Sequence, residues 1–248
     1  RALCCLRAIT GNVDKPGACV LAEAPDFVSE LAMEMSDAMP ASCRAAALSS
    51  YRTPLQSYAG YDALRALTER LGRTPPMRYL TSAHPDLVLR AMEEGRPYPI
   101  RALVVQATNP LLTYGDTARV QRALAALDLL VVLEYRLTPT AQLADYVLPI
   151  AGALERPVLQ VHGGIANAAY GGPAAVAPYY ERRCDYDVFR ELGRRLGQAE
   201  FWPEETLEDA FASQLLPAGL SWEEFCIEGT YWPRPAYAKH EALGADGR

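Results

Sequence analysis

The spacing of apolar residues along the chain changes near residue 100. Before it, apolar residues recur at helical intervals and prolines separate the segments. This pattern predicts helices at 1–9, 27–35, 61–71 and 86–94. The first helix should end at Gly11, because a glycine adopts the left-handed conformation that ends helices. After residue 100, short continuous apolar runs replace the helical spacing, which is typical of strands in a parallel sheet.

Three such runs, at 101–107, 129–134 and 146–150, are separated by helical segments. Asp116 is placed to cap the first of these helices, and Thr138 with Pro139 to begin a short second one through residue 144. A strand, a helix and a second strand in this order form parallel strands with a right-handed crossover. We therefore predict an α/β fold with a doubly wound, mainly parallel, Rossmann-like sheet and flanking helical segments. The first strand should be buried on both faces, and the buried set should be Val104, Val105, Leu124, Val131, Val132 and Val147.

Beyond residue 155 the pattern is less regular. A glycine-rich stretch predicts loop with irregular strand, and Asp185 is placed to cap a helix that Gly197 ends. Another helix should follow Pro203, and Ser221 with Glu224 has the spacing of a capping box. We expect three consecutive regions: a helical connecting region with the end of one cofactor domain at 1–100, a Rossmann-like domain at 101–200, and a helical, aromatic and proline-rich tail at 201–248.

The composition excludes several classes of protein. The 248 residues are 50% hydrophobic and 22% charged with a net charge of −6, so the chain is globular and has no basic surface for nucleic acid. Its longest apolar run, at 127–134, is too short to span a membrane. The six cysteines have no C-x-x-C spacing, so they predict free thiols and no metal site.

The chain does not begin with Met, and its first helix has no capping residue. We therefore expect an internal fragment of a longer polypeptide. Such a fragment shows no native leader, so the compartment stays open between the cytoplasm and export.

Candidate chemistry lies at the carboxyl ends of the predicted strands, where open parallel sheets bind ligands. Asn109 follows the first strand, and Glu134, Thr138 and Thr140 follow the second. A carboxylate at such a strand end can accept two hydrogen bonds from a nucleotide. No G-x-G-x-x-G motif follows the first strand, which weighs against a nicotinamide or flavin dinucleotide.

Structural explanations of the same residues stay open. Asn109 before Pro110 is a common turn pair, Thr138 is adequate as a helix cap, and Asp145 caps or bridges a loop equally well. Glu134 needs a partner after four apolar residues, and Arg136 or Arg156 would suffice. His162 stands in the glycine-rich stretch without a nucleophile or a carboxylate beside it, so no catalytic residue is assigned. The residues alone indicate a nucleotide-binding α/β domain.

Three ordered blocks carry a more specific resemblance. The blocks are Leu6-Arg-Ala-Ile-Thr-Gly-Asn-Val-Asp-Lys-Pro-Gly17, Gly95-Arg-Pro-Tyr-Pro-Ile-Arg-Ala-Leu-Val-Val105 with Thr108-Asn-Pro110, and Leu130-Val-Val-Leu-Glu-Tyr-Arg-Leu-Thr-Pro-Thr-Ala141 with Ala144-Asp-Tyr-Val-Leu-Pro149 and Leu154-Glu155. They resemble segments of the molybdopterin oxidoreductases of the dimethyl sulfoxide reductase family and cover most of residues 1–160. The segment 185–197 is similar to a helix of that family.

The resemblance implies an enzyme with a bis-molybdopterin guanine dinucleotide cofactor that holds molybdenum or tungsten. Asn109 would line the cofactor loop, Glu134 would hold the guanosine where the family frequently has Asp, Thr138 would contact the nucleotide, and Arg156 would be a basic contact. Thr140 and Asp145 stand in the matching motifs, and we count them as cofactor-binding candidates as well.

The resemblance also implies what lies outside these residues. We expect an iron–sulfur cluster in a missing N-terminal region and a metal-ligating residue elsewhere, so no metal ligand is assigned here. The partners would be the remaining domains of the same polypeptide and an iron–sulfur electron-transfer subunit. The expected chemistry is two-electron or oxygen-atom transfer with an unassigned substrate, and the fragment alone should be inactive.

Alternatives of other classes stay open. One is a cofactor-free structural subunit of a respiratory iron–sulfur complex, and another is a non-redox relative, a hydratase or a transhydroxylase. A third is the middle domain of a different nucleotide enzyme, which would retain Asn109 and Glu134 but not the three blocks.

Overall fold

The computed structural model describes residues 2–13, 15–19, 26–28, 39–48, 57–72, 83–161 and 167–233. Internal contacts divide the chain into two compact units that alternate along the sequence. Unit 1 comprises residues 1–33, 158–173 and 208–248, and unit 2 comprises residues 34–157 and 174–207. The division into three consecutive regions stays a prediction.

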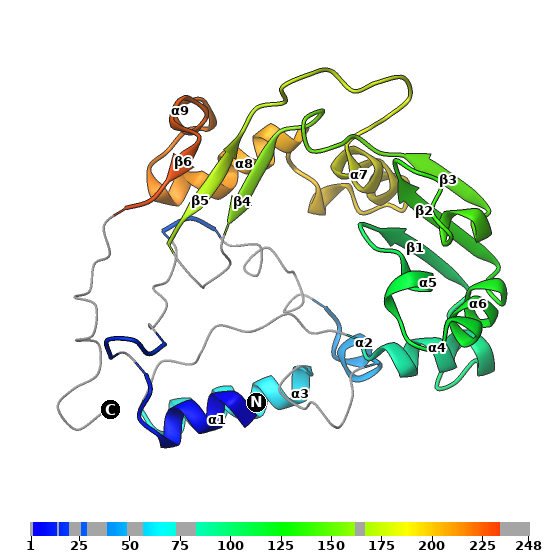
Figure 1. Ribbon diagram of the computed structural model, residues 1–248, viewed down its shortest axis with the longest axis horizontal. Coiled ribbons are helices and arrows are strands. Elements are labelled where there is room, and N and C mark those ends of the chain that lie inside the picture. Colours follow the sequence, from blue (N-terminus) through cyan, green and yellow to red (C-terminus); the bar gives the residue numbers. More distant parts are fainter. Residues whose placement is uncertain are drawn as a thin grey trace. The chain divides into compact units, whose positions relative to one another are not determined.

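Unit 2 contains a three-stranded parallel sheet in the order β1 (Ala102–Gln106), β2 (Leu129–Glu134) and β3 (Tyr146–Pro149), visible in Figure 1. The three predicted strands and their parallel pairing are confirmed. β1 pairs with β2 from Ala102 beside Leu129 onward, and the last residue of β2 lies beside the last residue of β3.

Helices α4 (Pro85–Glu94) and α6 (Thr117–Ala125) cover one face of this sheet. Asp116 caps α6 as predicted, with its side chain accepting from the Arg119 amide. The shared core is apolar and consists of Leu89, Met92, Val105, Leu111, Val120, Ala123, Leu124, Leu130, Val132 and Ala141. Burial of these side chains holds β1, α6 and β2 together.

The opposite face of the sheet is less covered than predicted. Val105, Leu124 and Val132 are buried, but Val104 on this face remains 40% exposed. Val147 is 38% exposed as well, although its pairing with Val132 puts it on the face that α4 and α6 cover. The expectation that the first strand is buried on both faces is therefore wrong. On the opposite face, a cavity of about 540 Å³ separates sheet residues such as Val104 and Val131 from α7 (Asp185–Arg195). Since α7 does not fill this space, Val104 keeps contact with solvent.

The remaining helices of unit 2 agree with the predicted segments where both are described. The predicted helices at 61–71 and 86–94 are confirmed as α3 (Tyr58–Arg70) and α4. Ser57 caps α3, which starts three residues earlier than predicted. The other short elements of this unit are α2 (Ala41–Ala45), α5 (Pro110–Thr113), η3 (Ala141–Leu143) and η4 (Ala199–Phe201). Most of the predicted helix at 27–35 lies outside the described residues.

Unit 1 contains an antiparallel sheet in the order β4 (Val158–Val161), β5 (Ala169–Gly172) and β6 (Thr230–Tyr231). The glycine-rich stretch is thus more regular than predicted. Gly171 allows the close approach of the β4 backbone, since a Cβ at this position would lie 1.8 Å from the Val158 carbonyl oxygen. The helical elements of the unit are α1 (Ala2–Ile9), α8 (Leu207–Leu215), η5 (Leu216–Ala218) and α9 (Trp222–Glu228).

Helix α9 begins with the predicted capping box. The Ser221 hydroxyl accepts from the Glu224 amide at 3.1 Å, and the Glu224 carboxylate accepts from the Ser221 amide at 2.9 Å. The cap orients α9 so that Trp222 and Phe225 are buried, and the Trp222 ring also contacts Phe211 of α8. The aromatic tail predicted after this helix lies mostly outside the described residues.

Candidate functional site

The chain leaves β1 through a left-handed residue. Ala107 has φ 54°, a backbone conformation that residues other than glycine rarely adopt. This turn is followed by Asn109, which precedes Pro110 at the start of the short helix α5. The Asn109 carbonyl oxygen accepts from the Leu112 amide at 2.9 Å, which holds the backbone of this residue. The loop therefore presents the Asn109 side chain just beyond the carboxyl end of the first strand.

A second loop follows β2 and has a similar local order. The Thr138 hydroxyl oxygen accepts from the Ala141 amide at 3.3 Å, and the Thr138 carbonyl oxygen accepts from the Gln142 amide at 2.9 Å. The short helix predicted through residue 144 is only the single 3₁₀ turn η3. Thr138 thus has the capping contact that its sequence position predicted, and its hydroxyl proton is left to donate.

Thr140 joins these two loops. Its hydroxyl lies 2.5 Å from the Asn109 Oδ1 atom and accepts from the Leu111 amide at 3.2 Å. The Thr140 side chain is fully buried, with 0% of the residue exposed. The structure therefore brings together two of the predicted site residues, Asn109 and Thr140, but Thr140 has no exposed surface with which to touch a ligand.

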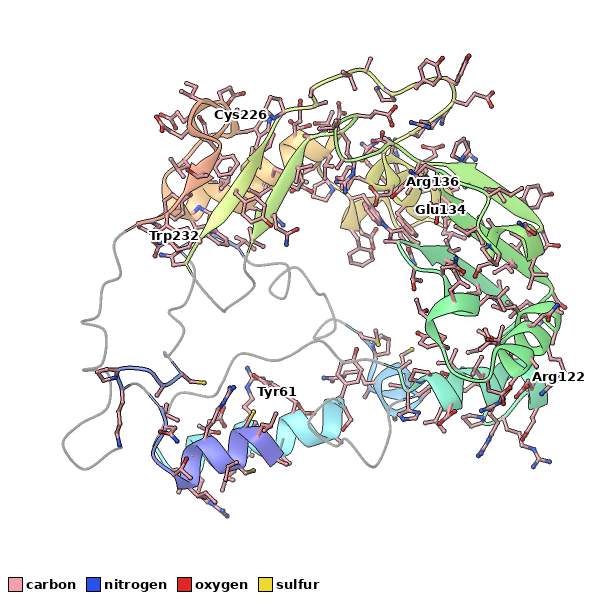
Figure 2. The ribbon with its side chains drawn as sticks, viewed as in Figure 1. Tyr61, Arg122, Glu134, Arg136, Cys226 and Trp232 are labelled. Carbon is pink, nitrogen blue, oxygen red and sulfur yellow. The ribbon has the colours of Figure 1, made fainter. Side chains whose placement is uncertain are left out.

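Glu134 ends β2 at the carboxyl edge of the sheet and is half-buried. One carboxylate oxygen accepts from the following Tyr135 amide at 2.9 Å. Within residues 83–161 and 167–233, no Lys or Arg side chain forms an ion pair with Glu134. Arg136 instead places its guanidinium 5.9 Å from the centre of the Tyr135 ring, and Figure 2 shows Glu134 and Arg136 at this end of the strand. An ion pair with Arg136 or Arg156 therefore does not account for Glu134.

Asp145 lies at the other edge of the sheet. It precedes β3, and its carboxylate accepts from the Leu130 amide at 2.7 Å near the start of β2. The Asp145 amide in turn donates to the Leu130 carbonyl oxygen at 2.9 Å. Because parallel strands start at the same edge, the structure separates Asp145 from Asn109, Glu134 and Thr138. These contacts favour the bridging role that the sequence left open for Asp145.

Arg156 follows β3 and is half-buried, and the described residues hold no acid in ion-pair range of it. Its neighbour Glu155 is the residue of this region whose role sequence reasoning missed. The Glu155 carboxylate accepts from the Gly152 amide at 2.7 Å and the Tyr179 amide at 3.1 Å, and it pairs with Arg182 at 2.9 Å. The Gly152 amide, together with the Tyr179 amide and Arg182, lowers the pKa of Glu155. Glu155 thus fixes the backbone beside Arg156.

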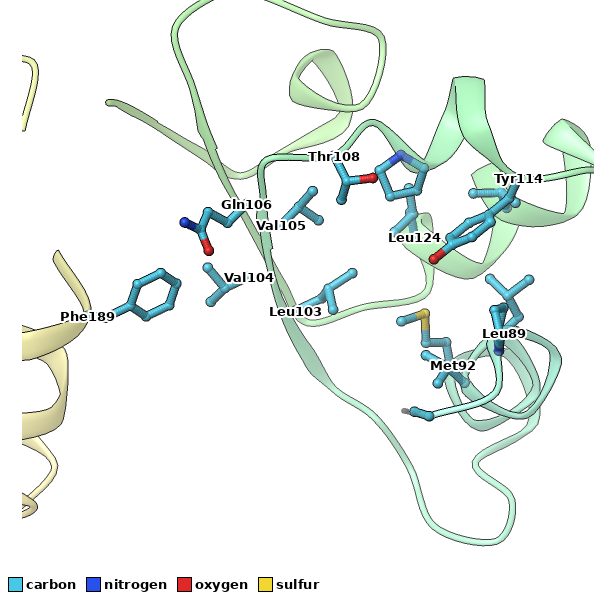
Figure 3. Close-up of a pocket in the computed structure, with 15 residues that line it drawn as sticks. Leu89, Met92, Leu103, Val104, Val105, Gln106, Thr108, Tyr114, Leu124 and Phe189 are labelled. Atoms are coloured by element: carbon cyan, nitrogen blue, oxygen red, sulfur yellow. The ribbon is translucent and has the colours of Figure 1, made fainter. Parts of the chain in front are cut away.

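A cavity of about 390 Å³ runs along β1, as Figure 3 shows. Its lining combines residues of β1 with Leu89 and Met92 of α4, with Tyr114, and with Phe189 of α7. It has no charged side chain in its lining, so it offers shape and apolar contact but no acid or base. At its end the lining includes Thr108, which belongs to the loop that carries Asn109.

The described residues offer neither a metal cluster nor a membrane-spanning helix. They contain no group of three or more His, Cys, Asp or Glu side chains placed to hold a metal ion. None of their helices is both long enough and apolar enough to cross a bilayer. His162 of the glycine-rich stretch lies outside the described residues.

Comparison with known proteins agrees with this α/β architecture. The family model for molybdopterin oxidoreductases matches residues 2–195, which include the whole parallel sheet and α7. The chain belongs to the molybdopterin oxidoreductase family. The sequence-based assignment is thereby confirmed, and membership implies a molybdopterin cofactor with molybdenum or tungsten.

Individual relatives of this molybdopterin oxidoreductase include proteins of several activities. Acetylene hydratase of Syntrophotalea acetylenica is 32% identical over 98% of this chain and 34% of its own length. The alpha subunit of an F420-dependent formate dehydrogenase of Methanococcus maripaludis is 27% identical over 94% of this chain and 32% of its own. The solved structure of acetylene hydratase from Pelobacter acetylenicus superposes with a TM-score of 0.77 at 31% identity, covering 90% of this chain and 31% of that one. The chain spans about a third of the length of these relatives.

Proposed function

We propose that this chain supplies the binding site for one guanine dinucleotide of a bis-pterin molybdenum or tungsten cofactor. The observation that carries the proposal is the hydrogen-bonding state of the carboxyl edge. Asn109 has an amide nitrogen, Glu134 a carboxylate oxygen and Thr138 a hydroxyl proton for which the described residues provide no partner. These groups come from the last residue of β2 and from the loops that follow β1 and β2, where parallel sheets bind nucleotides.

The donor and acceptor set fits a guanine nucleotide. A carboxylate such as Glu134 accepts from the two N–H donors on the edge of guanine, whereas an amide or hydroxyl donor suits ribose or phosphate oxygens. Arg156 adds a cation that can pair with the diphosphate, since the described residues hold no acid in ion-pair range of it. In this proposal the residues of the chain bind and orient the nucleotide, and the bound cofactor supplies the chemistry at its metal.

Asp145 and Thr140 do not enter the proposed ligand set. Asp145 lies at the amino edge, and Thr140 is fully buried. The proposed ligand residues of this chain are therefore Asn109, Glu134, Thr138 and Arg156.

We also propose that the complete protein is a redox enzyme whose further domains complete the cofactor site. An iron–sulfur cluster in its N-terminal region and an iron–sulfur partner subunit belong to the same proposal. The match to the alpha subunit of an F420-dependent formate dehydrogenase over 94% of the chain supports the redox activity and a further subunit. On its own, the 248-residue chain should purify without stoichiometric molybdenum or tungsten, because the cofactor would lose most of its contacts.

The test is the cofactor content of the full-length polypeptide, purified after expression in a host that makes the guanine dinucleotide form. We expect about two guanine nucleotides per metal atom after acid release, and a lower nucleotide content in Glu134→Gln than in Asp145→Asn. Metal-loaded protein that releases no guanine nucleotide would contradict the proposal. Equal content in the two variants would remove Glu134 from the site.

A second candidate function is hydration without net redox chemistry. It is supported by the similarity to acetylene hydratase over 98% of the chain. The two functions separate in two parallel assays of metal-loaded full-length protein, one with acetylene and neither an electron donor nor an acceptor, and one with a redox dye and no acetylene. Turnover of acetylene would favour the hydratase, and its absence together with oxidation or reduction of a redox dye would favour the oxidoreductase.

A further inference from the structure

The Thr140 hydroxyl is the centre of a short chain of hydrogen bonds. In this series of hydrogen bonds, the Leu111 amide nitrogen lies 3.2 Å from the Thr140 hydroxyl oxygen, which lies 2.5 Å from Asn109 Oδ1. The series connects α5, which follows β1, to the loop after β2, and its central residue is 0% exposed. No solvent therefore reaches the hydroxyl to replace either contact.

The direction of this chain follows from the number of protons. A backbone amide only donates, so the Thr140 oxygen accepts from Leu111 and must donate its own single proton elsewhere. The described neighbour that takes this proton is the Asn109 side chain, which must therefore turn its carbonyl oxygen toward Thr140. With the Asn109 amide group turned over, the hydroxyl would face two donors, and its proton would be buried without an acceptor.

The consequence lies on the other side of the Asn109 side chain. Since its oxygen is taken by Thr140, its NH₂ group is the part left for a ligand, and the described residues provide no acceptor for it. Asn109 is half-buried and lies beyond the carboxyl end of β1. The group bound there must be a hydrogen-bond acceptor, such as a phosphate oxygen.

We infer that Thr140 is a positioning residue, which turns the amide donors of Asn109 toward a phosphate oxygen of the nucleotide. This inference rests on the proposed function, because it takes the carboxyl edge as the nucleotide site. It replaces the sequence-based assignment of Thr140 as a ligand, which its burial does not allow. The rival explanation is a purely structural bond between two loops.

One substitution separates these explanations. Asn109→Asp keeps an acceptor for the Thr140 hydroxyl, so a structural bond would persist, but it replaces the outward donor with a negatively charged acceptor. We therefore expect Asn109→Asp to lower the guanine nucleotide content at least as much as Asn109→Ala, by about tenfold under limiting cofactor supply, the effect of about 1.4 kcal/mol. The melting temperature of the cofactor-free Asn109→Asp protein should stay close to that of the wild type.

Thr140 is tested in the same way with a matched pair. Thr140→Val keeps the shape and removes the hydroxyl, whereas Thr140→Ser keeps the hydroxyl. We expect Thr140→Val to lose nucleotide and Thr140→Ser to recover most of it. Should Thr140→Val fail to fold, the Asn109→Asp result still decides, because that variant retains the loop contact.

The measurement is guanine nucleotide released per full-length polypeptide, together with thermal unfolding of the cofactor-free protein. Wild-type protein that carries metal but no guanine nucleotide would contradict the proposed function itself. Wild-type protein with guanine nucleotide, combined with normal content in Asn109→Asp, would overturn only the positioning role. Loss of stability without loss of nucleotide in Thr140→Val would do the same.

Discussion

The two edges of the parallel sheet use their polar side chains differently. At the amino edge, Asp145 accepts from the Leu130 amide, and Arg101 pairs with Asp128 at 2.5 Å. At the carboxyl edge, Glu134 has a single contact with the next amide in the chain, and the Asn109 amide nitrogen has no described partner. The same three strands, each four to six residues long, run from one edge to the other.

This difference teaches that residue type alone does not distinguish a structural acid from a ligand. Asp145 and Glu134 are both acids at the end of an apolar strand, but Asp145 precedes β3 and bonds the neighbouring backbone, whereas Glu134 is the last residue of β2. Variants of these acids should therefore affect different properties. Asp145 at the amino edge should affect stability, and Glu134 should affect cofactor content.

The largest effect on stability should come from Glu155, which lies beyond β3. Its carboxylate, like that of Asp145, accepts hydrogen bonds from the backbone of the fold. Glu155→Ala leaves two backbone amides and Arg182 without their acceptor, so it should lower the melting temperature far more than Glu134→Ala does. The pKa of Glu155 is lowered in the folded chain. Its contribution is therefore present above the ordinary carboxyl pKa of 4.5 and is lost as the pH falls through the folded value.

Thermal unfolding between pH 7 and pH 3 measures both effects. Glu155→Gln should show a weaker decline in stability at acid pH than the wild type. Equal melting temperatures for Glu155→Ala and Glu134→Ala would refute the distinction between these acids.

The next effect concerns cofactor affinity. Glu134→Gln keeps the shape and removes the charge, which should cost about 1.5–3 kcal/mol of affinity, or roughly a tenfold to hundredfold change. Guanine nucleotide and metal content under limiting supply measure it, with thermal unfolding of the cofactor-free protein as the control. Unchanged content with a large loss of stability would show that Glu134 is a structural residue.

Asp145→Ala should have the reverse signature and a smaller magnitude. Removing the acceptor of the Leu130 amide should cost about 1–2 kcal/mol of unfolding free energy and leave the nucleotide content unchanged. Asp128→Ala is the matched control at this edge, since its pair with Arg101 is mostly exposed and should contribute little. Loss of nucleotide in Asp145→Ala would place this residue back in the site.

The smallest effect should come from the strained turn after β1. Ala107→Gly removes a side chain at positive φ and should stabilise the chain by about 0.5–1 kcal/mol. Ala102→Gly, in the regular backbone of β1, should destabilise it by a similar amount. Denaturant unfolding of the two variants gives the sign of each change, and destabilisation by both would show that Ala107 is not strained.

Much of the parallel sheet was predictable because its information is local. Apolar runs fixed β1, β2 and β3, and Asp116 marked the start of α6. The exposure of Val104 was not predictable, because it depends on how closely α7 packs on the second face. That of Val147 was not predictable because it depends on the position of β3 at the end of the strand order. The antiparallel sheet was missed for a similar reason, since β6 has only two residues and pairs with a strand about 60 positions earlier.

The site shows the same limit. The positions of Asn109, Glu134 and Thr138 follow from where strands end, and the chain order places Asp145 before β3. The bond between Asn109 and Thr140 joins residues 31 positions apart and depends on two side-chain conformations. The network of Glu155 depends on Arg182, 27 positions away. Contacts of this kind are set by the folded chain, not by a local pattern.

The alternation of the two units has a consequence for the order in which the chain folds. Phe27 is buried in unit 1 against Tyr231, and Asp26 bonds the Tyr231 hydroxyl across 205 positions. A ribosome needs roughly 10–40 s to add that many residues. By the end of this interval the strands of unit 2 have been synthesised for some time, whereas Tyr231, the aromatic partner of Phe27, has only just been added. Nascent chains should therefore gain protease resistance in unit 2 first, and exposed apolar surface in unit 1 is the natural target for a chaperone.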